Sequence, residues 1–468
     1  MSYAAGFKSL KREATVGALP VEGAMPQWLS GTLIRNGPAQ FEVGTDTYNH
    51  WFDGLAMLHA FQVADGEVSY RNRFLESRSR SEALEHGQIS RAEFATDPCR
   101  SIFRRVMSIF RPRLTDNACI NIAKLAGDWV AMTETPLPVA FDPETLETVG
   151  VTEFADDLDV QTMTAHPHIH PDTGQMTTYG ASFGRSCRYH VCAIDPGSRR
   201  RDVRARLPVD RPSYMHSFGL TERYAILSEW PLRVNPLDML LEGKPFIENY
   251  EWSAQEPTRF RVARLSDGEE VTQVEAPPAF AFHHVNAFEQ GDAIVCDIVT
   301  YNDASTIDEL YLERLRSDEP TPAVGTLHRY RLPLGGSTSL VKPEPLSETQ
   351  LELPRVHDQR IEGRPYRFVY GVGARKAGNF TDQLVKINVE SGASKTWREE
   401  GTYPGEPVFV PSPTGGAEDS GCILSVVLDP KQDRSFLLVL DAETFSEQAR
   451  APVPHAIPFG FHGQFLGN

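Results

Sequence analysis

Four histidines in this 468-residue chain stand far apart, and each lies in its own distinctive local sequence. They are His166 in Thr-Ala-His-Pro, His216 in Tyr-Met-His-Ser-Phe, His283 in Phe-His-His-Val-Asn and His462 in Gly-Phe-His-Gly. A short HxxxH or CxxC motif would place metal ligands on one helix or turn, and these histidines are not spaced in that way. Their spacing suits a metal ion on the axis of a radially built fold, with each ligand contributed by a different strand.

Imidazole ligands suit Zn, Cu, Fe and Ni. Four neutral imidazoles leave the 2+ charge of the metal uncompensated, so carboxylates are expected behind the rings, where they accept the outer N–H and fix the tautomer. Three glutamates stand in similarly distinctive settings, namely Glu134 in Met-Thr-Glu-Thr, Glu352 in Leu-Glu-Leu-Pro-Arg and Glu406 in Gly-Glu-Pro-Val-Phe. A rigid ring of four ligands can leave positions open, and O₂ binds at open positions of Fe(II), whereas Zn would close tetrahedrally as a structural site.

Histidine is common in this chain, and most histidines in proteins bind no metal. Adjacent residues on a strand face opposite sides, so only one of His283 and His284 can point toward an axis. His168 shares a face with His166 if that stretch is extended, and the sequence alone leaves the choice between them open. The competing histidines among the 14 in the chain are His50, His59, His168, His170, His284, His328, His357 and His455.

The surrounding sequence predicts an all-β fold. Short runs rich in β-branched and aromatic residues recur between turn signals, while helical periodicity is sparse; examples are residues 224–230, 293–301, 366–372, 422–428 and 436–441. Several strands end in an acidic or proline turn and then restart, as outer β-hairpins do; these are residues 139–150, 191–197, 385–397 and 437–444. Recurring hairpins suggest the blades of a propeller, and a β-sandwich array is the alternative that the pattern leaves open. We expect residues 1–468 to form a single domain.

Composition restricts the partners and the compartment. The chain has 46 Lys and Arg against 63 Asp and Glu, a net charge of −17, which disfavours nucleic acid as a partner. The six cysteines form no CxxC pair, and the start of the chain has no apolar h-region, which favours reduced thiols in the cytoplasm. No stretch of about 18 apolar residues predicts a membrane-spanning helix.

One segment breaks the β pattern. Residues 101–114 are basic, aromatic and amphipathic in an otherwise acidic protein, which is typical of a helix lying in a membrane interface. The alternative is an ordinary surface helix with its apolar face in the core. The interfacial interpretation predicts a peripheral membrane protein. Its membrane contacts would be Ile102, Phe103, Val106, Met107, Ile109 and Phe110.

Together these motifs resemble the carotenoid cleavage oxygenase family. The resemblance runs from residues 31–38 (Gly-Thr-Leu-Ile-Arg-Asn-Gly-Pro) and 51–61 to residues 458–463 (Pro-Phe-Gly-Phe-His-Gly), with all four histidine motifs in family order. It implies a seven-bladed β-propeller with a helical and loop cap over its top face, and an axial non-haem Fe(II) held by His166, His216, His283 and His462. It also implies Glu134 behind His216, Glu352 behind His283 and Glu406 behind His462, and it makes His59 a structural residue.

Residues 96–103, 115–117 and 133–135 are most similar to the animal-type branch, which contains β-carotene 15,15'-dioxygenases and the retinoid isomerase of the visual cycle. The resemblance implies that residues 97–114 dip into the membrane and deliver lipid to a tunnel, and Cys99 matches a position reported as lipidated in the isomerase. Stilbene-cleaving members carry a lysine where this chain has Thr133. The resemblance places Phe94 and Thr133 in the substrate cavity, and an apolar lining suits a polyene.

These observations lead to one main hypothesis, an Fe(II)-dependent dioxygenase that cleaves a C=C bond of a carotenoid or apocarotenoid with O₂, with central 15,15' cleavage to retinal as the expected reaction. The tunnel would select the bond by positioning it. The alternatives are a retinoid isomerohydrolase reaction with the metal as Lewis acid, cleavage of a stilbene or another apocarotenoid, and a binding module with a structural metal. We expect a monomer or weak oligomer, and the sequence leaves a retinal-binding partner open.

Overall fold

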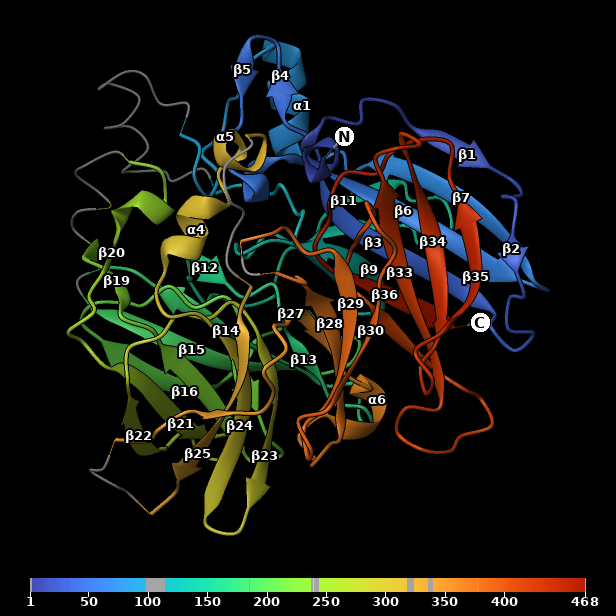
Figure 1. Cartoon of the computed structure of the whole chain (residues 1–468). Helices are drawn as coiled ribbons and strands as arrows, with labels where there is room; N and C mark the ends of the chain where they lie inside the picture. The colour runs from blue at the N-terminus through green and yellow to red at the C-terminus, as the bar shows by residue number, and fades with distance from the viewer. Residues whose placement is uncertain are drawn as a thin grey trace.

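The computed structural model describes residues 2–97, 114–184, 186–236, 239, 244–317, 324–335, 340–376 and 378–467. Within these residues, seven sheets of four to six antiparallel strands follow one another along the chain and around a ring (Figure 1). The fold is a seven-bladed β-propeller, which confirms the sequence prediction. Two further two-stranded sheets lie outside the blades.

Segments from opposite ends of the chain close the ring. In the first blade, Arg35 on β3 pairs with Gly463 on β36, and in the last blade, Glu22 on β2 pairs with Arg450 on β35. The first blade has the order β1 (Ala14–Val16), β7 (Glu67–Phe74), β6 (Leu55–Ala64), β3 (Gly31–Gln40) and β36 (Gly463–Gly467). The last blade contains β31 (Tyr403–Pro404), β32 (Val408–Pro411), β33 (Gly421–Asp429), β34 (Arg434–Asp441), β35 (Glu447–Pro452) and β2 (Glu22–Gly23).

The other five blades are each built from consecutive strands. The second and third blades contain β8 (Asn121–Leu125), β9 (Asp128–Met132), β10 (Val139–Phe141) and β11 (Thr148–Val151), then β12 (Thr162–Met163), β13 (His168–Ile169), β14 (Met176–Ser182), β15 (Cys187–Ile194) and β16 (Asp202–Val209). The fourth contains β17 (Gly219–Leu220), β18 (Tyr224–Glu229), β21 (Thr258–Arg264) and β22 (Glu270–Ala276). The fifth and sixth contain β23 (His284–Gln290), β24 (Ala293–Thr300), β25 (Thr326–Pro333) and β26 (Glu344–Pro345), then β27 (Glu352–Arg355), β28 (Phe368–Gly373), β29 (Gln383–Asn388) and β30 (Ser394–Trp397).

The position of a strand within its blade explains its hydrophobic pattern. The middle strands β18 and β24 are buried almost throughout, because both faces of a blade pack against neighbouring blades, and their sequences are mostly apolar without a regular polar alternation. The outer strands β16 and β22 alternate between buried and more exposed side chains over much of their length. The core therefore lies between the blades, and the inner strands are free to carry polar groups near the axis.

Short helices and loops form a cap on one side of the propeller, where α1, α4, α5, β4 and β5 gather (Figure 1). Helix α1 begins where the Ser77 hydroxyl accepts a hydrogen bond from the Arg80 N–H, and it ends at Gly87, which adopts a left-handed conformation. The helices are α1 (Arg78–His86), α4 (Ser305–Glu309), α5 (Leu312–Leu315), α6 (Asp358–Ile361), η1 (Tyr3–Phe7), η2 (Trp51–Asp53) and η3 (Ile247–Asn249). The two small sheets pair β4 (Glu42–Val43) with β5 (Asp46–Thr47) and β19 (Leu232–Val234) with β20 (Tyr250–Trp252).

The predicted membrane segment 97–114 lies outside the described residues, apart from Asp97 and Leu114 at its two ends. This applies to Cys99 and to all six predicted membrane contacts, Ile102, Phe103, Val106, Met107, Ile109 and Phe110. In the described part of the chain, no helix has both the length and the apolar character needed to cross a membrane. The five cysteines that the structure does describe are buried free thiols.

Candidate metal centre

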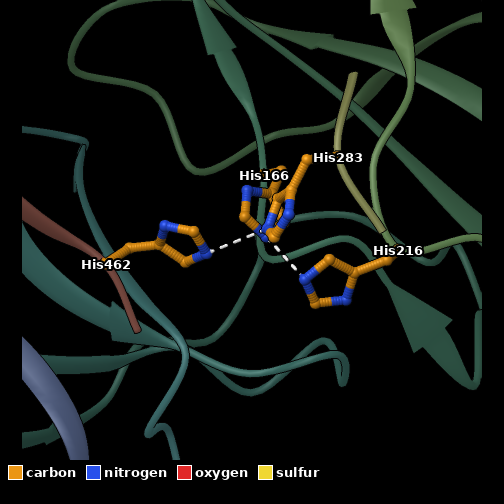
Figure 2. Close-up of side chains that lie close together, drawn as sticks. All are labelled: His166, His216, His283 and His462. Atoms are coloured by element: carbon orange, nitrogen blue, oxygen red, sulfur yellow. Dashed lines mark hydrogen bonds between the residues drawn. The ribbon is translucent and has the colours of Figure 1, made fainter. Parts of the chain in front are cut away.

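The structure brings the four predicted histidines together at the inner ends of four different blades. His216, His283 and His462 each precede the innermost strand of a blade, β17, β23 and β36, and His166 lies between β12 and β13. One ring nitrogen from each histidine lies within 4.8 Å of the corresponding nitrogens of the other three. Figure 2 shows His462 and His216 at opposite sides of the cluster, with His166 and His283 between them.

The distances between the rings are those of ligands around one ion. Nε2 of His166 lies 2.9 Å from Nε2 of His216, and Nε2 of His283 lies 3.3 Å from Nε2 of His462. With metal–nitrogen bonds of about 2.1 Å, two ligand nitrogens at right angles would be about 3.0 Å apart. His216, His283 and His462 are buried and His166 is half-buried, so the cluster is shielded from bulk water on most sides.

A glutamate holds three of the four rings from behind. Nδ1 of His216 lies 2.6 Å from Glu134 Oε1, and Nδ1 of His283 lies 2.7 Å from Glu352 Oε2. Nδ1 of His462 is likewise 2.7 Å from Glu406 Oε1. These are the three pairings that the family resemblance implies. Among the described residues, His166 is the one member of the cluster whose ring has no glutamate behind it.

The hydrogen bonds determine which nitrogen of each ring carries the proton. A neutral imidazole has one N–H and one lone pair, so donation from Nδ1 to a carboxylate leaves the lone pair on Nε2. The Nε2 atoms of His283 and His462 then present two lone pairs to each other across 3.3 Å. That arrangement is repulsive by itself and becomes favourable when a cation lies between the rings. The donor set therefore fits a transition-metal ion of the kind that imidazole binds.

Burial keeps two of these imidazoles, those of His166 and His462, in the unprotonated form that a metal requires. It lowers the pKa of His462 to about 4, although the Glu406 carboxylate acts in the opposite direction. The pKa of His166 falls well below its usual value, because burial is reinforced by the other histidines of the cluster. Metal ions bind the neutral ring, so at neutral pH protons do not compete for these two ligands.

Two arginines, the buried Arg35 and the half-buried Arg355, flank the carboxylate of Glu406, and sequence reasoning did not identify them as part of the site. Arg35 forms a short hydrogen-bonded ion pair with Glu406 Oε2, and Arg355 Nη1 lies 3.5 Å from Oε1. Burial alone would raise the pKa of Glu406, but Arg355, Arg35 and His462 together lower it to about 2. Both arginines lie inside motifs that the family resemblance rests on. The sequence could not show that they contact Glu406, because that contact forms only when the blades are neighbours in the ring.

The competing histidines have other partners. His168 bonds to the Glu362 carboxylate through Nδ1 and to the Phe218 carbonyl oxygen through Nε2, at 2.9 Å. The ring nitrogens of His284 lie 2.8 and 2.7 Å from the hydroxyls of Ser217 and Ser228. Both nitrogens of each ring are therefore engaged away from the cluster, which decides the alternatives that the sequence left open.

His59, which the resemblance makes structural, also lies apart from the cluster. Its Nδ1 is 2.9 Å from the Tyr70 hydroxyl, and the same hydroxyl is 3.0 Å from His455 Nε2. The three side chains are buried together, so this motif histidine joins β6 and β7 of the first blade to the segment before the closing strand.

A small cavity reaches Glu134, the glutamate behind His216. Most of its lining is apolar or aromatic, and includes Met163, Ala181, Phe183, Tyr214, Met215 and Phe246. Phe94, predicted as a cavity residue, packs against two of these, with its ring centroid 5.7 Å from that of Tyr214 and 6.3 Å from that of Phe246. Thr133 is half-buried and directly precedes Glu134. The roles of Phe94 and Thr133 in binding substrate stay predictions.

Comparison with known sequences identifies relatives along the whole chain. A family model described as retinal pigment epithelial membrane protein matches residues 7–467. The mitochondrial carotenoid-cleaving dioxygenase of Mustela putorius furo is 37% identical over 95% of this chain and 93% of its own length. The β,β-carotene 15,15'-dioxygenase of Rattus norvegicus is 34% identical over 95% of this chain and 88% of its own length.

Comparison with solved structures agrees with the sequence matches. The cobalt-substituted apocarotenoid oxygenase of Synechocystis matches this fold with a TM-score of 0.88 at 28% sequence identity, covering 100% of this chain and 98% of that protein. The match therefore includes all seven blades and the strands that bring the histidines together. The extent of the sequence matches, the shared propeller and the fit of the histidine cluster to a metal ion lead to one assignment: this chain belongs to the carotenoid cleavage oxygenase family.

Proposed function

We propose that this protein is a non-haem Fe(II) dioxygenase that cleaves one C=C double bond of a carotenoid or apocarotenoid, with central 15,15' cleavage to retinal as the expected reaction. One O₂ is consumed for each bond cleaved, and each former alkene carbon takes one oxygen atom, so that two carbonyl products result. The observation that carries the proposal is the convergence of four imidazole nitrogens, and it is supported by a largely apolar cavity at Glu134, behind one of these rings. Imidazole ligands suit iron, and a polyene requires an apolar lining.

Bound Fe(II) would supply the position at which O₂ is activated. Burial lowers the pKa of His166 and His462, which keeps these two imidazoles neutral. The carboxylates of Glu134, Glu352 and Glu406 fix the orientation of three of the four rings. The apolar walls exclude water and determine which double bond lies over the metal. No side chain has to transfer a proton to the substrate, because a C=C bond carries no labile proton. All four histidines come from one chain, so a monomer suffices to build the site.

Product analysis on iron-loaded protein tests this proposal. We expect β-carotene or an apocarotenal to be cleaved to aldehydes, identified by mass spectrometry, with about one O₂ consumed per bond in an oxygen electrode. Retinol release from a retinyl ester without O₂ consumption would replace the proposal with the isomerohydrolase reaction. Cleavage of a stilbene alone, or no reaction with any of these substrates, would also overturn it.

We further propose that the protein attaches peripherally to membranes on the cytoplasmic side through the amphipathic segment 97–114. Replacing Phe103, Ile109 and Phe110 together with serine is expected to weaken binding to phospholipid vesicles by at least about tenfold, because burying each of these side chains favours association by roughly 1.5–3 kcal/mol. Vesicle co-sedimentation measures the change. Cleavage of a detergent-solubilised carotenoid should be unaffected.

Val149 offers a matched control for this substitution. It is an apolar side chain on β11 with 76% exposure, so Val149→Ser removes exposed apolar surface elsewhere on the molecule. Vesicle binding of Val149→Ser should equal that of the wild type. Equal binding by the triple variant would refute the membrane proposal and leave the proposed reaction untouched.

A further inference from the structure

Two of the three glutamates behind the histidines accept hydrogen bonds from buried tyrosines. The Tyr301 hydroxyl donates to Glu352 Oε1 at 2.8 Å. The Tyr214 hydroxyl lies 3.1 Å from both carboxylate oxygens of Glu134. The third glutamate, Glu406, is held by two arginines instead. Each carboxylate thus has its own outer partner in addition to its histidine.

The backbone fixes the Tyr301 ring in place. Tyr301 directly follows β24 and exchanges two backbone hydrogen bonds with Phe280, at 2.7 and 3.0 Å. Its ring centroid lies 6.0 Å from that of Phe282, and its side chain is buried. A phenol held in this way has little freedom to follow a moving carboxylate, so the carboxylate is held by the phenol.

The hydrogen bonds to Glu352 fix the rotation of its carboxylate. Oε2 accepts from His283 Nδ1 and from the backbone N–H of Leu353, and Oε1 accepts from Tyr301. With the phenol removed, Oε1 loses that donor, and the carboxylate plane can turn. Turning would misalign the oxygen that orients His283, since ring orientation depends on this hydrogen bond.

We propose that Tyr301 and Tyr214 are positioning residues of the metal centre, each of which locks the rotation of a carboxylate that orients a metal-binding histidine. The inference rests on the proposed metal centre and deepens it. Tyr214 also lines the cavity and packs against Phe94, so its substitution would change substrate binding as well. Tyr301 does not line this cavity, and it therefore isolates the effect on the metal.

The variant Tyr301→Phe keeps the ring and removes only the hydroxyl. Binding of Co²⁺ to the metal-free full-length protein, measured by competition with a chromophoric chelator, should weaken about threefold to tenfold, less than the 10–100-fold typical of losing the carboxylate itself. The visible absorption bands of bound Co²⁺ should shift, because the His283 ring is less firmly oriented. With iron, kcat should fall while KM for the carotenoid stays unchanged.

Tyr366→Phe is the matched control. The buried Tyr366 hydroxyl donates to Asp297 Oδ2 at 2.8 Å, the same bond to a carboxylate that has no metal-binding histidine beside it. Both variants should lower the Tm of the metal-free protein by similar amounts, but Tyr366→Phe should bind Co²⁺ with wild-type affinity and spectrum.

The outcomes separate this inference from the proposed function. Wild-type affinity and spectrum in Tyr301→Phe, or an equal loss in Tyr366→Phe, would overturn the positioning role alone. Failure of the wild-type protein to bind Co²⁺ or Fe²⁺ would overturn the metal centre and the inference with it. A wild-type protein that binds metal but cleaves no carotenoid would overturn the proposed reaction and leave the role of Tyr301 standing.

Discussion

Replacing His283 with alanine is expected to abolish stoichiometric iron binding and to reduce carotenoid cleavage by at least about a thousandfold, a loss of roughly 4 kcal/mol of transition-state stabilisation. The substitution removes one of the four converging lone pairs and leaves Nε2 of His462 without the neighbour 3.3 Å away. It also leaves the half-buried Glu352 without its histidine. Elemental analysis of the purified variant and oxygen uptake with substrate measure the two effects.

The adjacent histidine provides the control. His284 is half-buried, and its ring is hydrogen-bonded to two serines on the far side of the strand. His284→Ala should therefore lower the free energy of unfolding by about 1–3 kcal/mol while iron content and specific activity stay near those of the wild type. Full iron content in His283→Ala, or equal loss of iron in both variants, would contradict the assignment of the metal ligands.

Replacing Glu406 with glutamine is expected to have the largest effect on stability. The carboxylate is fully buried and lies between Arg35 and Arg355, so a neutral side chain leaves the buried Arg35 guanidinium without its counter-ion, while the half-buried Arg355 keeps its ion pair with Asp358. Breaking a buried ion pair in this way costs about 3–5 kcal/mol of unfolding free energy. The affinity for metal should also fall, by up to about 10–100-fold, because His462 then donates to a neutral amide oxygen instead of a carboxylate. Denaturant unfolding of the metal-free protein measures the first effect.

Glu147 supplies the comparison for this substitution. It forms an ion pair with Arg73 at 2.7 Å, but its side chain is 66% exposed. Exposed pairs contribute about 0–1 kcal/mol, so Glu147→Gln should leave both stability and metal affinity close to the wild-type values. A similar small effect of Glu406→Gln would show that the buried network around His462 is not what holds this part of the propeller.

Lowering the pH tests the contribution of the Glu406 carboxylate to stability without a substitution. The pKa of Glu406 is lowered from 4.5 to about 2 in the folded protein, because the two arginines and His462 outweigh burial. The contribution of the ionised Glu406 carboxylate to the unfolding free energy is therefore fully present above about pH 4.5 and is lost as the pH falls through about 2. The shift corresponds to roughly 3 kcal/mol. In this window, the unfolding free energy of the metal-free wild type should fall more steeply than that of Glu406→Gln.

The sequence predicts the hairpins of the blades well because their signals are local. In the hairpin between β10 and β11, the Asp142 carboxylate accepts backbone N–H bonds from Glu144 and Thr145, and Leu146 has a positive φ of 60°. The turn after β34 repeats this, with Asp441 accepting from Thr444 and with Phe445 at φ 63°. A short acidic turn motif is sufficient to specify such a hairpin.

Contacts between blades could not be predicted from local sequence signals in this way. Residues 35 and 406 meet because the first and last blades are neighbours in the closed ring, and no local pattern encodes that neighbourhood. The same holds for Tyr301 and Glu352, which lie on the fifth and sixth blades. The histidines and glutamates were found because each lies in a family motif, whereas their outer partners depend on packing geometry that only the assembled ring supplies.

The seam of the ring and the metal cluster share a residue, because His462 immediately precedes the strand β36 that docks against β3. A polypeptide in which β36 has not yet paired with β3 presents three metal ligands instead of four. Pairing of these two strands therefore closes the ring and completes the histidine cluster in one event. By mass action, each tenfold rise in free metal above the dissociation constant would raise the free energy needed to separate β36 from β3 by about 1.4 kcal/mol. Bound metal would therefore stabilise the closed ring, and removing it with a chelator would first weaken the pairing of β36 with β3.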